Sequence, residues 1–246
     1  DQVPYSMVYK GTTYLPLRKL IELLGKELVL DGASSTVYIK EKMDYVVNWT
    51  DPAFESLMRK ALNKPSGDIN RSELDNIKSL YIQGDYVSFV EPAKVMSVDP
   101  VIRIRSIEDI THFKNLNYLR FNAHPITDIS PLAKMTGLET LILNNNEITD
   151  ITPLSKLTNL KVLTLDYNYI SDVTPLSNLT NLTELTLDYN KIRDISPLSN
   201  LTNLKLLFID ANQISDIKLL SELQKLAELT LNYNYITDVS PLSNLT

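Results

Sequence analysis

One regularity constrains this chain more than any other. An asparagine followed two residues later by isoleucine returns every 22 residues, at Asn146, Asn168, Asn190, Asn212 and Asn234. A fixed period of this length is typical of an array of small units, each of which covers the apolar face of its neighbour. Six such units run through residues 113–244. The sequence therefore predicts a solenoid.

The first half of each unit has the spacing of a short β-strand. Leu163 and Leu165 are two residues apart, so both side chains point to the same face of a strand. Asn168 follows where the chain must turn away, and its amide can pair with buried backbone groups of neighbouring coils. This pattern, with its step of 22, is that of a leucine-rich repeat. We expect parallel strands in one curved sheet, near residues 118–121, 140–143, 162–165, 184–187, 206–209 and 228–231.

The second half of each unit predicts a tight return path. Its apolar residues advance in steps of three, the spacing of a 3₁₀-like turn, at Ile170, Val173, Leu176, Leu179 and Leu182. Thr174-Pro175 supplies a cap followed by a proline at a first helical position. The expected fold is an α/β solenoid, a horseshoe with the parallel sheet on its concave face and 3₁₀-like turns on its convex side.

At this point the chain resembles a known family. The phrases Leu-Thr-Asn-Leu and Asp-Ile-Ser-Pro-Leu are similar to the repeats of internalins and related bacterial surface proteins, over residues 113–246. Two units depart from the pattern, because His124 replaces the asparagine of the first and Lys218-Leu219 replaces Ser-Pro in the fifth. The resemblance implies a non-catalytic extracellular or cell-surface protein, from a Gram-positive-type bacterium, whose concave sheet binds a protein partner.

Residues 1–43 do not share the period and predict a small α+β module. We expect a strand over Val3–Tyr9, an amphipathic helix from Pro16 to Leu24, and strands over Glu27–Leu30 and Thr36–Lys40. The phrase from Tyr9 to Arg18 resembles the copper amine oxidase N-terminal-like domain. That resemblance implies a stalk module of secreted bacterial proteins that carries neither copper nor an active site.

Residues 44–112 predict a helical cap and irregular first coils. Asp51-Pro52 begins a helix, and Ser72 caps a second short one. A solenoid end exposes a slab of apolar core, so a cap with a polar outer face is needed for solubility. The segment from Ile77 to Val87 already fits the repeat, with Asp85 at the asparagine position. The predicted divisions are 1–43, 44–112 and 113–246.

Composition excludes several functions. The net charge of −6 disfavours nucleic acid and anionic lipid as partners, and no apolar run is long enough to insert into a membrane. The chain has no cysteine, and the segment from Asp68 to Ser79 lacks the glycine and glutamate of a calcium loop. His112 and His124 have no adjacent nucleophile. We expect no enzyme, no metal site and no cofactor, with His124 substituting for the repeat asparagine.

The outward side chains of the sheet suggest where a partner binds. The position after the second strand leucine reads Asn122, Asn144, Asp166, Asp188, Asp210 and Asn232. The three carboxylates would lie about 4.8 Å apart, repel one another and titrate together, so they favour a cationic partner or a divalent ion. Exposed tyrosines give contact area at low entropy cost. The candidate partner-binding residues are Asp166, Asp188, Asp210, Tyr167, Tyr189, Tyr233, Glu184, Glu228 and Phe208.

Two alternatives to protein binding stay open. Tyrosines flanked by carboxylates would also serve a carbohydrate or cell-wall binding module. The chain stops at Leu245-Thr246, at the start of a further repeat, so we expect a fragment of a longer protein in which the solenoid could be a spacer or scaffold.

Overall fold

The computed structural model describes the backbone of four short strands before residue 44 and, beyond them, residues 44–90 and 103–244. The chain divides into two compact units, Asp1–Val46 and Val47–Thr246. Each unit is described by itself.

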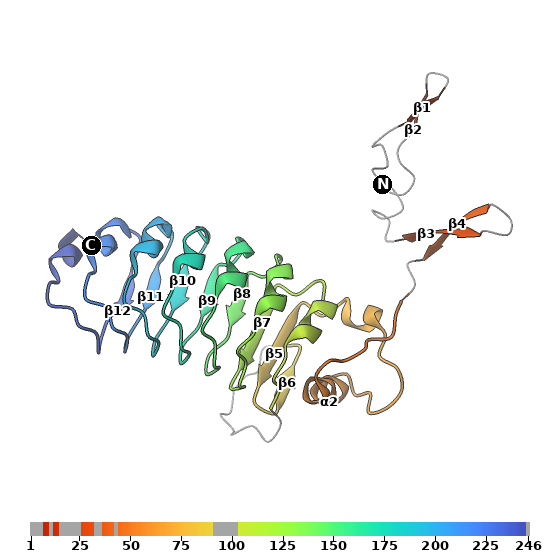
Figure 1. The fold of residues 1–246 in the computed structure, drawn as a ribbon, viewed down its shortest axis with the longest axis horizontal. Helices are drawn as coiled ribbons and strands as arrows, with labels where there is room; N and C mark the ends of the chain where they lie inside the picture. Colours follow the sequence, from red (N-terminus) through yellow and green to blue (C-terminus); the bar gives the residue numbers. More distant parts are fainter. Residues whose placement is uncertain are drawn as a thin grey trace. The chain divides into compact units, whose positions relative to one another are not determined.

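The first unit contains two antiparallel pairs (Figure 1). Strand β1 (Met7–Tyr9) pairs with β2 (Thr12–Tyr14), and β3 (Lys26–Asp31) pairs with β4 (Thr36–Glu41). The two strands predicted after residue 26 are confirmed, and β1 confirms the last part of the first predicted strand. Strand β2 was not predicted. The helix predicted over residues 16–24 lies outside the described residues.

The second unit is the predicted solenoid. Its eight-stranded sheet has the order β12-β11-β10-β9-β8-β7-β5-β6. All neighbours in this sheet are parallel except β5 and β6. From β7 to β12 the register advances by one repeat per strand, so that Leu163 lies between Leu141 and Leu185. The strands predicted from the repeat are confirmed within two residues; they are β7 (Tyr118–Asn122), β8 (Thr140–Ile142), β9 (Val162–Thr164), β10 (Glu184–Thr186), β11 (Leu206–Phe208) and β12 (Glu228–Thr230).

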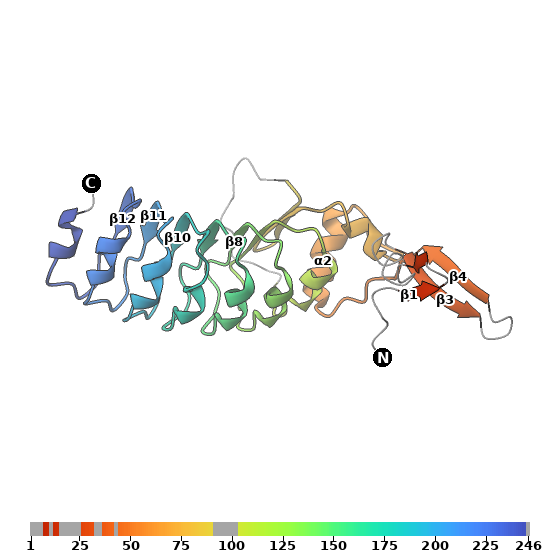
Figure 2. The ribbon, with the colours of Figure 1, turned by 90° about the horizontal axis from the view of Figure 1, so that it is seen from above.

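The convex side of the solenoid consists of 3₁₀ turns, as the steps of three predicted (Figure 2). They are η2 (Glu108–His112), η3 (Ser130–Lys134), η4 (Thr152–Lys156), η5 (Thr174–Leu176), η6 (Ser196–Asn200), η7 (Lys218–Glu222) and η8 (Ser240–Asn244). The predicted cap is wrong. The residue at the N-cap of η5 is Val173, and Thr174 follows it as the first residue of the turn; the backbone N–H of Thr174 donates to Asp172 Oδ1 at 2.8 Å. The aspartate just before the N-cap residue thus accepts the first N–H of the turn, and the same bond recurs at Asp128, Asp150, Asp194, Asp216 and Asp238; we call these aspartates the convex caps.

An asparagine in each regular coil, buried in all of them but the last, joins that coil to the one before it. Asn190 Nδ2 lies 3.0 Å from Leu165 O, 3.1 Å from Leu187 O and 3.2 Å from Asp188 O, and donates to these carbonyls. Its Oδ1 accepts from the N–H of Ile170 at 3.0 Å. We call this column the core ladder; its members are Asn146, Asn168, Asn190, Asn212 and Asn234. The backbone pairing expected of these residues is confirmed.

His124 takes the core ladder position of the first unit. Its Nδ1 accepts from the N–H of Ile104 at 3.3 Å, and the side chain is buried. Burial lowers the pKa of His124 to about 4, against the opposing carboxylates of Asp85 and Asp51. The imidazole is therefore neutral at pH 7 and can accept this bond. The expected substitution is confirmed.

A helical cap closes the first coil. Helix α2 (Pro52–Ala61) begins after Asp51, as predicted, and Asp51 Oδ1 accepts from the N–H of Ala53 at 2.8 Å. Its Oδ2 accepts from the N–H of Arg105 at 2.8 Å, which ties the helix to the solenoid. Cap and repeats share one core, which extends from Val47 to Leu226.

Two predictions for the cap are wrong. The short turn η1 (Arg71–Leu74) contains Ser72 rather than starting at it, because the N-cap is Asn70, whose N–H donates to the Glu73 carboxylate at 2.7 Å. Strand β5 (Ser79–Gln83) follows the repeat, but Asp85 does not begin a return path. The chain reverses at Gly84, with φ of 54°, into the antiparallel strand β6 (Tyr86–Ser88).

Candidate binding surface on the concave sheet

The three predicted aspartates belong to a second hydrogen-bonded column, at the end of the strands. The N–H of Asp188 donates to Asp166 Oδ1 at 3.0 Å, and the N–H of Asp210 donates to Asp188 Oδ1 at 2.7 Å. The same bond continues to Asn232 at 2.7 Å. We call this column the concave ladder; its members are Asn122, Asn144, Asp166, Asp188, Asp210 and Asn232.

Sequence reasoning missed this bonding. The aspartates were expected to be outward charges whose repulsion nothing relieves, whereas each one accepts a backbone N–H of the next coil. Asp166 also accepts from Thr186 Oγ1 at 2.9 Å and from Asn144 Nδ2 at 3.1 Å. The signal that could have revealed the ladder was present, since this position holds only Asn or Asp in all six units.

The concave ladder is nevertheless electrostatically strained. Burial, together with the neighbouring charges of Asp166 and Asp210, raises the pKa of Asp188 to about 6, although the bond from the N–H of Asp210 acts to lower it. Burial also raises the pKa of Asp166. The repulsion expected from the spacing contributes to the raised pKa of Asp188, after burial. A fraction of the Asp188 carboxyl group is therefore protonated near neutral pH, so a cation placed beside it would draw the proton off.

Two of the three predicted tyrosines form a stacked pair beside this ladder. The rings of Tyr167 and Tyr189 lie 4.3 Å apart at an interplanar angle of 9°. Their side chains are half exposed. Tyr233 does not join this pair, because Ala211 holds the tyrosine position in the coil between Tyr189 and Tyr233. Tyr233 is 82% exposed. The predicted row is therefore a pair and an outlying third ring.

The backbone at these tyrosines has an unusual conformation. Tyr167, Tyr189 and Tyr233 have φ of 56°, 54° and 56°. The left-handed region costs a residue with a side chain about 1 kcal/mol relative to glycine. Large aromatic residues are thus placed, and left exposed, where glycine would serve the turn better. This choice favours a role for the rings in recognition.

The other predicted residues lie on the same face. Glu184 and Glu228 are exposed at the starts of β10 and β12, with Leu206 of β11 between them. Phe208 is half-buried, and its neighbours across the sheet are Thr186 and Thr230. The glutamates therefore lie at the opposite end of the strands from the concave ladder.

A hollow of about 340 Å³ lies where the tyrosine column stops. Ala123 and Asn145 hold the tyrosine position in the first two units, so Tyr167 forms a wall of this hollow. Tyr169 is a second wall, and the ammonium of Lys191 lies 4.7 Å from the centre of its ring. This hollow extends the aromatic surface toward the cap.

The described residues give no second kind of site on this face. No group of three His, Asp or Glu side chains among them could hold a metal ion. His112 lies 4.0 Å from the buried carboxylate of Asp109, within the cap. No helix in the described part of the chain is long and apolar enough to cross a membrane.

Comparison with known proteins agrees with this geometry. Residues 136–178 and 180–223 match the family model "Leucine Rich repeats (2 copies)". The fold and this match define a leucine-rich-repeat protein.

The solved structures narrow the family. Internalin C2 of Listeria monocytogenes is 32% identical, with a TM-score of 0.65 over 80% of this chain and 90% of that chain. The chain belongs to the internalin family of leucine-rich-repeat proteins. Internalin F of Listeria monocytogenes is also 32% identical, with a TM-score of 0.48 over 80% of this chain and 67% of that one.

A leucine-rich-repeat protein of Leptospira interrogans is more distant. It is 26% identical, with a TM-score of 0.52 over 56% of this chain and 38% of its own. No curated protein sequence matches the chain. A solenoid of the internalin type is a scaffold for protein interaction.

Proposed function

We propose that this chain is a non-catalytic, secreted or cell-surface bacterial protein that recognises a protein partner through its concave face. The observation that carries the proposal is the stacked pair Tyr167 and Tyr189, held at positive φ beside the concave ladder. The contact surface consists of Asp166, Asp188, Asp210, Tyr167, Tyr189, Tyr233, Glu184, Glu228 and Phe208.

Charge defines the kind of partner. Strands β8 to β12 contain no Lys or Arg, so no cation on them answers the concave ladder. A partner with a basic patch would relieve the repulsion at Asp188 and would be steered to the face by the long-range field. The tyrosine pair would form the apolar centre of the contact, where aromatic residues usually contribute most of the affinity.

The experiment separates charge from structure. The triple variant Asp166→Asn, Asp188→Asn, Asp210→Asn keeps every Oδ1 acceptor of the ladder, as Asn144 already does at its position. A partner captured from host-cell or cell-wall extracts is purified, and its Kd is measured for both proteins at several salt concentrations. We expect weaker binding and a smaller salt dependence for the triple variant.

A matched control changes the same number of charges elsewhere. Asp150→Asn, Asp172→Asn and Asp194→Asn alter three exposed caps on the convex side. We expect this variant to bind as the parent chain does. Unchanged affinity of the concave variant, with no salt dependence, would mean that the functional surface lies elsewhere.

Carbohydrate or cell-wall binding is the second candidate. Exposed Tyr169 and Tyr235 lie beside the tyrosine column and would offer ring faces to sugars. A glycan array with the parent chain and a Tyr167→Ser, Tyr189→Ser variant distinguishes the two functions. Glycan binding that depends on this pair, without a protein partner, would replace the first proposal. If none of these variants loses protein binding or glycan binding, the result would favour a spacer or scaffold.

For the first unit we propose an accessory role. Its two antiparallel strand pairs are compatible with the stalk module that the copper amine oxidase N-terminal-like resemblance implies. Deleting residues 1–43 should leave partner affinity unchanged. Fractionation of the producing bacterium, with antibody to the repeats, tests the proposed surface or secreted location.

A further inference from the structure

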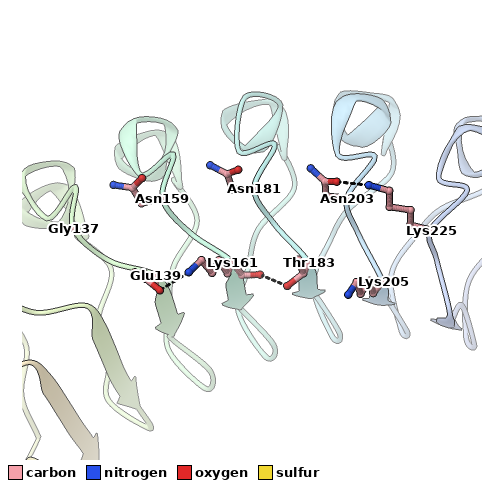
Figure 3. A pocket seen from close by; sticks show the side chains of 9 residues that line it. All are labelled: Gly137, Glu139, Asn159, Lys161, Asn181, Thr183, Asn203, Lys205 and Lys225. Atoms are coloured by element: carbon pink, nitrogen blue, oxygen red, sulfur yellow. Dashed lines mark hydrogen bonds and ion pairs between the residues drawn. The ribbon is translucent and has the colours of Figure 1, made fainter.

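A separate groove lies along the edge of the solenoid where the strands begin, away from the concave ladder (Figure 3). Its volume is about 570 Å³. Figure 3 shows two rows of side chains, one beside the convex turns and one at the starts of the strands. The lining residues come from five successive coils; they are Gly137, Glu139, Asn159, Lys161, Asn181, Thr183, Asn203, Lys205 and Lys225.

The row beside the turns is a rigid line of amides. Asn159 Nδ2 donates to Thr136 O at 2.9 Å, Asn181 Nδ2 to Thr158 O at 2.8 Å, and Asn203 Nδ2 to Thr180 O at 2.9 Å. One N–H of each amide is used in this way, which leaves a second N–H on each amide and the Oδ1 acceptors of Asn159 and Asn181, while the Oδ1 of Asn203 accepts from Lys225. The groove therefore presents donors and acceptors at a fixed repeat.

The groove is basic in a chain of net charge −6. Three lysines and one glutamate are the charged residues of its lining. Lys161 Nζ lies 2.7 Å from Glu139 Oε2, and Lys225 Nζ donates to Asn203 Oδ1 at 2.7 Å. Within the described part of the chain, Lys205 and Lys225 make no ion pair. Two of the three ammonium groups are thus available to an anion.

The basic edge continues toward the cap. A second hollow of about 320 Å³ shares Gly137 and is lined by Lys114 and Lys134. Gly137 occupies the position that Asn159 and Asn181 hold in later coils, so no side chain separates the two hollows. A linear ligand could follow the edge across both.

The spacing of the lysines selects among anionic ligands. Lys161 and Lys205 hold the same position two coils apart, which is about 10 Å for strands spaced by about 4.8 Å. That distance is comparable to the length of one disaccharide unit in a linear polysaccharide. An extended peptide places side chains of one face roughly 6.6 Å apart, which does not match. The lining also contains no aromatic side chain that could anchor an apolar peptide residue.

We propose that this groove binds a linear anionic polysaccharide that runs along the solenoid axis. Its sulfate or carboxylate groups contact Lys161, Lys205 and Lys225, and its hydroxyl groups contact the amides of Asn159 and Asn181. Binding here is independent of the concave face, so one chain can hold a glycan and a protein at once.

The test uses the full chain and four polymers. Heparin carries sulfate, polygalacturonate carries carboxylate, dextran is the neutral control and poly-glutamate is the peptide control. We expect heparin or polygalacturonate to bind at low ionic strength, to be displaced by salt, and to bind roughly tenfold more weakly to Lys205→Gln, Lys225→Gln. The matched control Lys191→Gln, Lys218→Gln makes the same change in net charge outside the groove and should bind like the parent.

A gain of affinity provides a second readout that misfolding cannot produce. Glu139→Gln removes the carboxylate that holds Lys161 and adds one unit of positive charge to the groove. We expect roughly two- to threefold tighter binding of the same polysaccharide.

Three results would overturn the proposal. One is an equal loss of polysaccharide affinity in the groove variant and in the matched control variant, which would show that binding responds to net charge alone. Another is tighter binding of poly-glutamate than of either polysaccharide, which would make the groove a peptide site. The third is the absence of binding to both anionic polysaccharides at low ionic strength.

Discussion

The core ladder and the concave ladder differ in what they demand of their residues. Both return once per coil, and both bond one coil to the next. In each unit they are two residues apart, as Asp188 and Asn190 are. The core ladder is neutral and is buried except at Asn234, whereas the concave ladder carries three carboxylates that are each half-buried.

The difference follows from hydrogen bonding. Asn190 donates to three carbonyls and accepts one N–H, so its position needs an amide, and a carboxylate could not donate. The concave position only needs an acceptor, which both Asn144 and Asp166 supply. The fold therefore does not require a charge at the concave ladder. For this reason we propose that the three carboxylates serve binding.

The largest effect is expected from the core ladder. Asn190→Leu leaves the buried N–H of Ile170 without its acceptor and removes one of two donors from each of three carbonyls, and should lower the free energy of unfolding by roughly 1–3 kcal/mol. Lys191→Ala is the control, because that side chain is exposed over the ring of Tyr169, and it should cost about 0.5 kcal/mol or less. Urea unfolding followed by circular dichroism measures both. Equal midpoints would remove the argument for the ladder.

Substitution in the concave ladder should raise the free energy of unfolding instead of lowering it. Asp188→Asn keeps the acceptor for the N–H of Asp210 and removes a charge that folding disfavours. We expect a stabilisation of about 1 kcal/mol at pH 7, allowing for partial solvent screening.

The pH dependence checks the cause of this stabilisation. The pKa of Asp188 is about 6 in the folded chain, against an ordinary value of 3.8. Between these values the folded state binds more protons than the unfolded state, so the parent chain loses stability as pH rises from about 4 to about 6. The advantage of Asp188→Asn should therefore vanish near pH 4. An advantage that persists there would mean that burial and charge are not its source.

A third comparison is between two substitutions at one position of the tyrosine column. Tyr189→Gly and Tyr189→Ala both remove the stack with Tyr167, but only glycine relieves the φ of 54°. The glycine variant should be more stable than the alanine variant by roughly 0.5–1 kcal/mol. Thermal unfolding of the two proteins under one set of conditions measures the difference. Equal stability would show that the turn stores no strain.

The sequence predicted the parts of the fold that repeat. The step of 22 located six strands, the core ladder and the apolar return path, because every coil makes the same contacts as its neighbours. It also predicted that His124 replaces an asparagine, since the imidazole stands at the ladder position. These features are set by interactions between equivalent residues.

Features without a repeat were less accessible. The reversal at Gly84 into β6 breaks the template after a strand that fits it, and nothing in the spacing up to Asp85 signals the change. The stack of Tyr167 on Tyr189, and the isolation of Tyr233, depend on side-chain positions across coils. The concave ladder was missed for another reason, because an outward aspartate on a strand is normally solvated and here accepts a backbone N–H.

The smallest effect is expected at the convex caps and has the sign opposite to that of Asp188. Asp172 accepts from the N–H of Thr174 at 2.8 Å, and bonds from that residue lower the pKa of Asp172. A lowered pKa means that the ionised cap stabilises the fold above the ordinary value of 3.8 and that this contribution is lost as pH falls through the folded pKa. Asp172→Asn retains an acceptor oxygen, so it should destabilise the chain at pH 7 by less than Asp188→Asn stabilises it. The deficit should shrink below pH 4, where the gain of Asp188→Asn has also disappeared. Denaturant midpoints of both variants and the parent, measured from pH 3 to pH 7, test this prediction. If both variants shift the midpoint in the same direction at pH 7, the carboxylates of Asp172 and Asp188 do not differ in the way that their hydrogen bonds and burial imply.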